Sequence, residues 1–318
     1  MNDNLHFYKT RFESELTNFF SQNGPKYLYD PIKYFMLSGG KRLRPSIVLF
    51  LGDILKNNPD DMMNAALGVE FLHCFSLVHD DIMDEDDLRH NQETIHKKWD
   101  NASAVLSGDG LGALGPIYIS KIEKNTLEIL RKYNRVILEI CEGQAYDMQF
   151  ENQNIVSDDY ILMSSKKTGV LFQLCFEIPI INNGENSELL ELFSLIGLNL
   201  GIIFQIQDDV LEIDNHQAEI GKSIFSDIKR NKKTILTSLA FEHLGENWLD
   251  FQNSISQHPH SLKRTMLIQY LKDNKVDVLA RDKVDFYKNK VFENVKELPK
   301  IFQDPINETI SLIIRRKK

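Results

Sequence analysis

Apolar residues recur at helical spacing along almost the whole chain, and no segment alternates between apolar and polar residues as a strand would. Glycine and proline, which punctuate strand-and-turn architectures, are sparse at 16 and 9 of 318 residues. Long helices packed around a shared core satisfy this pattern, and no linker interrupts it. We therefore predict an all-α fold, a single-domain bundle of long helices over residues 1–318.

The same periodicity places the individual helices. We expect them over residues 3–22, 45–57, 60–87, 100–115, 125–150, 158–181 and 187–214, with helical structure again over 234–318. Asn101 or Ser103 would cap the helix that begins near residue 100. Residues 215–233 are polar and rich in lysine, so we expect a loop there.

Composition excludes several classes of partner and compartment. The formal charge of −9 provides no basic field for nucleic acid. Cys74, Cys141 and Cys175 are widely spaced among apolar residues, which indicates buried, reduced thiols rather than disulfides or a zinc site. No signal-peptide pattern opens the chain, and no apolar run approaches the length of about 20 residues that spans a bilayer. A cytoplasmic protein without a transmembrane segment is the prediction.

Two acidic clusters, at residues 80–87 and 208–212, each follow an apolar stretch of a predicted helix. At about 100° per residue, Asp80, Asp84 and Asp87 share one face of the first helix, and Asp208 and Glu212 share one face of the second. Clustered carboxylates repel one another unless a cation compensates them, and Mg²⁺ prefers such oxygen ligands. An acidic run is more often a solvated helix face. Here, however, each stripe changes from apolar to acidic at one end, which describes a central apolar cavity with a charged mouth.

Basic residues that could hold a second anion lie in three other segments. Gly39–Pro45 places Lys41, Arg42 and Arg44 just before a helix, Arg89 follows the first acidic cluster, and Lys166-Lys167-Thr168 lies further along. Arginine suits bidentate phosphate contacts. Each segment alone is weak evidence for anion binding, since basic turns at helix ends are common. A histidine such as His73, taken by itself, is more often an ordinary core residue.

Taken in order, these segments resemble the trans-type, all-α isoprenyl diphosphate synthases, also called polyprenyl synthetases. The matching segments are Gly39–Pro45, Glu70 with His73, Ser76–Asp84, Gly108-Asp109, Gly143-Gln144 with Asp147, Lys167-Thr168, Phe204-Gln205 with Asp208-Asp209, and Gly221-Lys222. The resemblance covers about residues 38–235 and implies the isoprenoid synthase fold.

The resemblance also implies roles for individual residues. Mg²⁺ ions, about three for each active site, would be held by a set of carboxylates: Asp80, Asp81, Asp84, Asp208, Asp209 and Glu212. The allylic diphosphate would be bound by Arg89, Lys167, Lys222 and Lys232, and isopentenyl diphosphate by Lys41, Arg44, His73 and His90. The side chains of Thr168 and Gln205 would direct their dipoles at the reacting carbon. Asp80, Asp84, Asp208, Lys167, Thr168 and Gln205 would form the catalytic set.

The implied reaction is the head-to-tail condensation of isopentenyl diphosphate with dimethylallyl, geranyl or farnesyl diphosphate. The allylic C–O bond would ionise, the isopentenyl double bond would attack the cation, and a proton would leave, giving a C15–C20 trans-prenyl diphosphate. The family also implies a homodimer. Phe75, five residues before Asp80, would close the apolar cavity and limit product length; the less favoured alternative is an ordinary core residue.

Departures from the family pattern keep other functions open. His90-Asn91 stands where Arg-Gly is usual, and Glu212 stands where aspartate is usual; Phe225 and Asn231 replace loop glycines. A terpene cyclase-like enzyme acting on one allylic diphosphate would tolerate the loss at His90. A non-catalytic subunit of a heteromeric synthase is the third possibility, but such subunits commonly lose part of an aspartate cluster, and both clusters are kept here.

Overall fold

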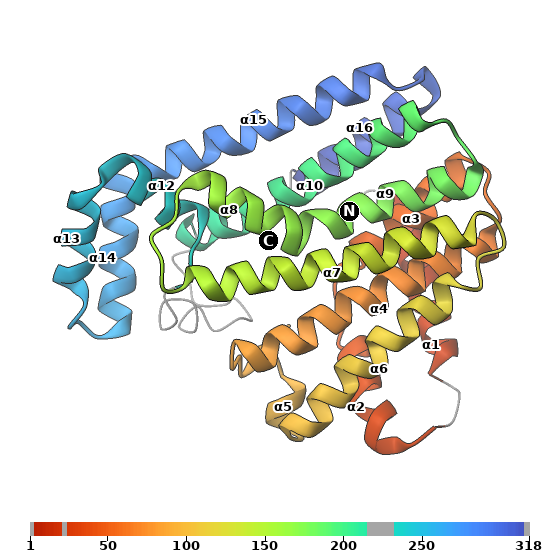
Figure 1. Cartoon of the computed structure of the whole chain (residues 1–318), viewed down its shortest axis with the longest axis horizontal. Coiled ribbons are helices and arrows are strands. Elements are labelled where there is room, and N and C mark those ends of the chain that lie inside the picture. Colours follow the sequence, from red (N-terminus) through yellow and green to blue (C-terminus); the bar gives the residue numbers. More distant parts are fainter. Residues whose placement is uncertain (1–2, 21–23, 215–231, 315–318) are drawn as a thin grey trace.

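The computed structural model describes residues 3–20, 24–214 and 232–314, and helices dominate it (Figure 1). The helices are α1 Asp3–Phe19, α2 Lys26–Leu37, α3 Leu43–Ile54, α4 Pro59–Met83, α5 Ile95–Lys98, α6 Asn101–Ile119, α7 Thr126–Phe150, α8 Ser157–Ser164, the π-helical turn η1 Ser165–Gly169, α9 Val170–Asn183, α10 Ser187–Asp214, α12 Ile235–Leu244, α13 Glu246–Ile255, α14 His260–Asp273, α15 Val276–Glu297 and α16 Lys300–Ile314. A two-residue hairpin, β1 Leu88–Arg89 with β2 Gln92–Glu93, is the sheet within the described residues. The all-α prediction is confirmed.

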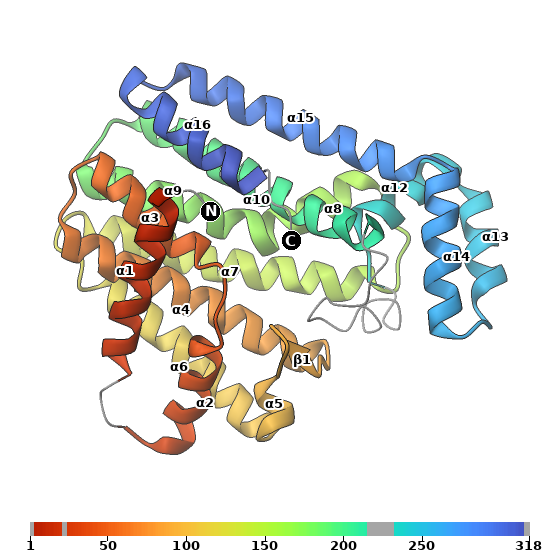
Figure 2. The same ribbon diagram turned by 180° about the vertical axis from the view of Figure 1, so that it is seen from behind.

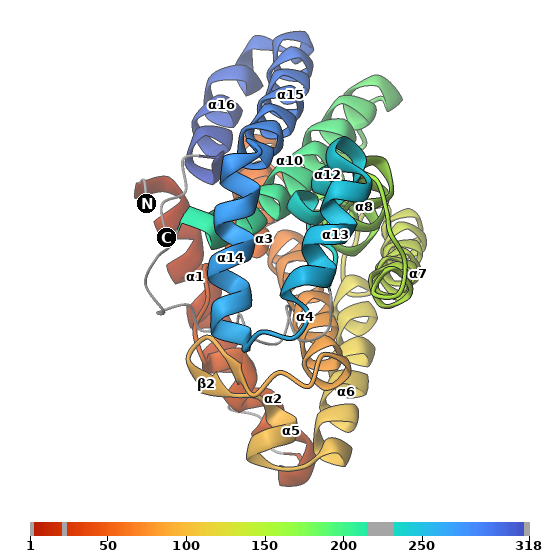
Figure 3. The same ribbon diagram turned by 90° about the vertical axis from the view of Figure 1, so that its left-hand side faces the viewer.

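The long helices pack side by side in a bundle. α4 packs against α3 and α6, α7 against α9 and η1, and α10 against α9, η1 and α15. Figures 1 and 2 show α15 and α16 along one edge of the bundle and the α2–α5–α6 region along the other. Seen from the end in Figure 3, the α13 and α14 pair stands at the extremity of the long axis. One continuous cluster of buried apolar side chains runs from Phe12 to Ile313.

Local sequence explains where several helices begin. Asn58 caps α4 by accepting from the backbone N–H of Asp60, and Pro59 occupies the first helical position. Asp100 caps α6 by accepting from the N–H of Ser103, so the expected caps, Asn101 and Ser103, are one and three positions too late. No helix was expected over residues 26–37, where α2 forms around Pro31.

The first acidic helix is shorter than its sequence pattern indicates. α4 ends at Met83, Asp84 caps it, and Glu85 has a positive φ of 53°. A helix continuing to residue 87 would stack carboxylates along its last turns, where they repel. The chain instead turns into the β1–β2 hairpin, so Asp87 does not share the face of Asp80 and Asp84.

The expectation that no apolar run approaches 20 residues is wrong for helix α10. Ser187–Leu211 is long and apolar enough, by length and composition, to cross a bilayer, and no other helix among the described residues meets that test. More than half of its most apolar stretch is buried inside the bundle, as expected for a core helix. Buried thiols are confirmed for Cys74 and Cys175, whereas Cys141 is exposed; all three are free.

Candidate active site

The π-helical turn η1 is wedged between two glycines of neighbouring helices. A Cβ at Gly143 on α7 would lie 2.3 Å from the backbone nitrogen of Lys167, and a Cβ at Gly201 on α10 would lie 2.6 Å from the Cα of Gly169. Only glycine, whose side chain is a hydrogen atom, allows α7 and α10 to lie this close to η1. The segment expected to be one helix over 158–181 is thus interrupted at the residues with predicted catalytic roles, and π-turns of this kind are frequent at functional sites.

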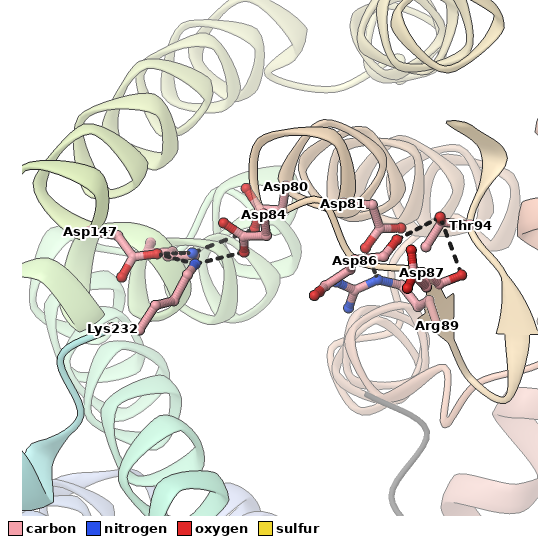
Figure 4. Close-up of polar contacts among 10 residues, drawn as sticks. Asp80, Asp81, Asp84, Asp86, Asp87, Arg89, Thr94, Asp147 and Lys232 are labelled. Carbon is pink, nitrogen blue, oxygen red and sulfur yellow. Dashed lines mark hydrogen bonds and ion pairs between the residues drawn. The ribbon is translucent and has the colours of Figure 1, made fainter. Parts of the chain in front are cut away.

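Five charged side chains converge beside η1, and Figure 4 labels four of them: Asp80, Asp84, Asp147 and Lys232. Lys167 Nζ lies 2.7 Å from Asp147 Oδ2 and 3.6 Å from Asp80 Oδ2. Lys232 Nζ, from the segment preceding α12, lies 2.6 Å from Asp84 Oδ2 and 3.0 Å from the same oxygen of Asp147. Asp80, Asp84, Lys167 and Lys232, four predicted site residues, therefore meet around Asp147. We call these five residues the carboxylate–lysine cluster.

Electrostatics keep this cluster charged although it is largely buried. Burial raises the pKa of Asp147, but Lys167 and Lys232 outweigh that effect and lower it to about 2. Burial likewise opposes the charge of Lys167, yet the carboxylates of Asp80, Asp147 and Asp84 raise its pKa above the ordinary value. The shifts therefore favour the ionised forms of Asp147, Lys167 and Lys232, although these side chains are largely buried.

The donor set of the cluster fits a hard divalent cation. Asp80 and Asp84 present carboxylate oxygens on one side of α4, close enough to Asp147 for single ammonium groups to bridge them. No group of three or more metal-ligating side chains is preformed within the described part of the chain. Mg²⁺ is commonly bound through one or two carboxylates together with substrate phosphates, so this arrangement suits it.

Asp81 belongs to a second, separate group at the end of α4. Arg89 donates through Nε to Asp81 Oδ1, and its Nη2 lies 3.6 Å from Asp86 Oδ2; all three side chains are buried. Thr94 donates to the carbonyl of Asp86 at 2.7 Å. Figure 4 shows this group apart from the lysines. In this arrangement Arg89 neutralises part of the acidic run.

The hairpin that carries Arg89 also explains the departure at residues 90 and 91. His90 and Asn91 form the two-residue turn between β1 and β2, and both have positive φ, 51° and 62°. A turn with two such residues matches the twist of a hairpin, and asparagine and histidine are among the side chains that adopt this conformation more readily. The unusual pair is therefore compatible with an intact hairpin.

The second acidic cluster is tied to η1 by a chain of hydrogen bonds. Thr168 Oγ1 donates to Gln205 Oε1 at 3.0 Å, and Gln205 Nε2 donates to Asp209 Oδ1 at 3.3 Å. Asp209 Oδ2 accepts from the Tyr160 hydroxyl at 2.6 Å and from the N–H of Ile235 at 3.0 Å. Burial raises the pKa of Asp209 to about 7, although these donors oppose the shift. Asp209 thus fastens α10 to α8 and to the start of α12.

Cationic side chains gather around His73. Arg44 Nη1 lies 3.2 Å from His73 Nε2, and its guanidinium stacks 4.5 Å from the centre of the Phe172 ring. Burial lowers the pKa of His73 well below its ordinary value, and the charges of Arg44, Arg42, Arg89 and His90 lower it further. Arg44, His73 and His90, three predicted ligands of isopentenyl diphosphate, therefore lie within electrostatic reach of one another. Lys41, the fourth predicted ligand, is exposed and directly precedes Arg42 in the chain.

Asp208 lies within electrostatic reach of both Arg44 and Asp209. Burial lowers the pKa of Arg44, and the charge of half-buried Asp208 is near enough to oppose that shift. Whether Asp208 faces Asp80 and Asp84, as the helical stripes indicate, stays a prediction. Lys222, Phe225, Asn231 and the side chain of Glu212 lie outside the described part of the chain.

The sequence assigned no role to two residues of this region, Asp147 and Tyr160. Asp147 was noticed only as part of a motif, and nothing in the sequence signals Tyr160. The central apolar cavity stays a prediction, since the two hollows we describe, of 440 and 260 Å³, lie at Tyr34 and at Gln207. Phe75 packs edge-on to His79, with ring centres 4.9 Å apart, and faces Gly112 of α6.

Comparison with known proteins agrees with this geometry. The model of the family "Polyprenyl synthetase" matches residues 25–269. A geranylgeranyl diphosphate synthase of Saccharolobus solfataricus is 33% identical over 314 residues, 95% of this chain and 94% of its own. A geranylfarnesyl diphosphate synthase of Natronomonas pharaonis is 34% identical over 269 residues, 78% of each chain.

Solved structures place the fold in the same group. The crystal structure of a geranylgeranyl pyrophosphate synthase superposes with a TM-score of 0.90 at 31% identity, covering 100% of both chains. The fold and the prenyltransferase class expected from the ordered motifs are both confirmed. The chain belongs to the polyprenyl synthetase family.

Proposed function

We propose that this protein catalyses the Mg²⁺-dependent head-to-tail condensation of isopentenyl diphosphate with an allylic diphosphate, giving a short-chain C15–C20 trans-prenyl diphosphate. The carboxylate–lysine cluster is the observation that carries the proposal. It brings Asp80 and Asp84, suited to a metal, within direct contact of Lys167 and Lys232, suited to a diphosphate. A site of this kind binds a polyanion through metal and ammonium groups together.

We propose that Asp80, Asp84 and Asp208 hold the Mg²⁺ ions, with Glu212 beside them. When bound, Mg²⁺ supplies charge stabilisation for the departing diphosphate. Lys167 and Lys232 would donate to the diphosphate oxygens and keep the leaving group in place. Both lysines already contact Asp80 or Asp84, which supports their ability to contact a diphosphate bound at the same carboxylates.

Asp81 and Asp209, which the family resemblance placed in the same ligand set, have a supporting role in this proposal. Asp81 pairs with Arg89, and Asp209 accepts from Tyr160 and Ile235. Both carboxylates therefore hold neighbouring elements in position. Arg89, fixed by this ion pair, would present its remaining N–H groups toward the diphosphate site.

The basic group around His73 is proposed to bind isopentenyl diphosphate. Lys41 and Arg44 supply the positive charge, His90 lies within electrostatic reach of His73, and neutral His73 accepts from Arg44. Two separate anion sites distinguish a condensing enzyme from a cyclase, which ionises one diphosphate only. The presence of this second group favours condensation.

Thr168 and Gln205 are proposed to stabilise positive charge on the reacting allylic carbon. The hydrogen bonds from Thr168 and to Asp209 fix the orientation of the Gln205 amide, so its carbonyl oxygen points toward η1. Because this dipole is already oriented, little reorganisation energy is needed when positive charge develops on the allylic carbon. The buried helices around it exclude water, which would quench a cation.

We also propose a cytoplasmic homodimer built from single-domain subunits. Large apolar side chains stand exposed along α6 and α7, namely Val105, Leu106, Ile117, Leu127 and Leu138. Such a surface suits burial against a second copy. The three free thiols suit a reducing compartment, and the continuous core suits one domain.

Incubation with Mg²⁺, isopentenyl diphosphate and each allylic diphosphate tests the proposal, with products dephosphorylated and sized by chromatography. Elongated prenyl alcohols are expected. Cyclised hydrocarbon from an allylic diphosphate alone would favour the cyclase. No turnover by a correctly folded protein with any donor would favour a non-catalytic subunit.

A further inference from the structure

One carboxylate oxygen connects both lysines of the active site. Asp147 Oδ2 accepts from Lys167 Nζ at 2.7 Å and from Lys232 Nζ at 3.0 Å. These lysines come from segments 20 and 85 residues away along the chain. The Asp147 side chain is only 6% exposed, so its ion pairs with the two lysines are buried and not surface ion pairs. Figure 4 shows Asp147 and Asp84 on either side of the lysine ammonium groups.

Each lysine also touches a carboxylate that is proposed to bind metal. Lys167 reaches Asp80 at 3.6 Å, and Lys232 reaches Asp84 at 2.6 Å. Cations that enter between Asp80 and Asp84 must compete with these ammonium groups. Asp147 lies on a different helix, α7, and its contact with the lysines does not depend on α4.

Two ammonium groups that share one oxygen atom repel each other strongly in a buried site. The carboxylate between them offsets this repulsion and fixes both side chains at one point. Without it, the carboxylates that still contact the two lysines among the described residues are Asp80 and Asp84 on α4, which the metal requires.

We propose that Asp147 is a positioning residue for both diphosphate-binding lysines. It holds Lys167 and Lys232 beside the metal-binding aspartates, so that metal and diphosphate can replace the contacts with Asp80 and Asp84 while both lysines stay in the site. This inference rests on the proposed function and assigns a role to a residue outside its ligand sets.

The test is calorimetric titration of the full-length protein with inorganic diphosphate at saturating Mg²⁺, and with Mg²⁺ alone. Asp147→Asn should weaken diphosphate binding about tenfold, the typical effect of losing a hydrogen bond to a charged group. Glu142→Gln is the matched control: it removes a 2.6 Å ion pair to Lys166 that joins the same elements, α7 and η1. It should leave diphosphate binding unchanged.

A double-mutant cycle separates positioning from direct binding. If Asp147 acts through Lys232, Asp147→Asn combined with Lys232→Gln should weaken binding by much less than the product of the two single effects. Full additivity would overturn the inference. If Asp147→Asn does not fold, Asp147→Glu, which keeps the charge but moves it by one methylene, replaces it. Its diphosphate binding should be weakened with Mg²⁺ binding retained, and parental diphosphate binding would overturn the inference.

Failure of this inference is distinguishable from failure of the proposed function. A parent protein that binds diphosphate with Mg²⁺ but forms no prenyl product refutes the function alone. Parental diphosphate binding by Asp147→Asn refutes the positioning role alone. A parent protein that does not bind diphosphate refutes both.

Discussion

Gly143 controls how closely α7 approaches the π-helical turn, and Gly143→Ala is the perturbation that tests this geometry. The added Cβ would lie 2.3 Å from the nitrogen of Lys167 and 2.7 Å from its Cα. Ordinary contacts begin near 3.4 Å, and both neighbours are backbone atoms that cannot rotate away. The two segments must therefore separate by about 1 Å, taking Lys167 and Thr168 with them.

The expected effect on turnover is larger than the effect on stability. A misplacement of about 1 Å at a catalytic group can reduce the rate about 100-fold, or about 2.7 kcal/mol in the barrier. Overpacking costs about 1–3 kcal/mol of folding free energy, but alanine recovers about 1 kcal/mol of helix preference. A folded protein with strongly reduced kcat is the expected result.

The assay compares kcat and urea unfolding for the parent, Gly143→Ala and a control. Gly110→Ala on α6 is suitable, because its Cβ would meet only the tips of Leu28 and Ile32, at 3.0 and 3.1 Å, which can adjust. The control should keep kcat within about twofold of the parent. A folded Gly143→Ala protein with the kcat of the control would refute the reasoning.

Three further predictions concern buried groups near the site. Tyr160→Phe removes a donor that lowers the pKa of Asp209, which is about 7 in the parent. Because the pKa of Asp209 in the folded protein already exceeds its unfolded value, ionisation of Asp209 destabilises the folded state as pH rises. The variant should therefore lose about 1 kcal/mol more unfolding free energy at pH 8 than at pH 6 in urea unfolding; an equal loss at both would contradict this. The pKa of His73 is depressed in the folded state, so stability should fall as pH drops below about 6.5, by at most about 1.4 kcal/mol per unit, and His73→Gln should flatten that slope. An unchanged slope would count against it. Phe75→Ala should lengthen the products sized by chromatography, and the parental product pattern would remove the residue from length control.

Helical periodicity was sufficient to predict the fold class and most of the long helices, because every helix packed in a bundle needs an apolar face with a 3.6-residue repeat. It failed where a long-range contact decided the local structure. α4 ends at Met83 because the following residues turn back so that Arg89 can bond to Asp81, a pairing that no local pattern encodes. Pro31 lies inside α2, where a proline ordinarily marks a boundary.

In the candidate site, the direction of each side chain on its helix, and not its place in a motif, determines which residues it contacts. About 100° of rotation separates Asp80 from Asp81 on their helix, so the two carboxylates face different neighbours: a lysine for one and Arg89 for the other. Asp147 and Tyr160 gain their roles from contacts with residues 85 and 49 positions away. One sequence contains no record of such proximity.

The central claim is that Asp80 and Asp84 bind the metal that activates an allylic diphosphate for condensation. The most direct measurement is prenyl product formation from isopentenyl diphosphate and an allylic diphosphate, with Mg²⁺ or excess chelator, by the parent and Asp80→Ala. The parent is predicted to elongate the donor only with Mg²⁺, and Asp80→Ala, folded as judged by circular dichroism, to show no turnover. Near-parental activity in Asp80→Ala, or elongation that persists in chelator, would contradict the claim.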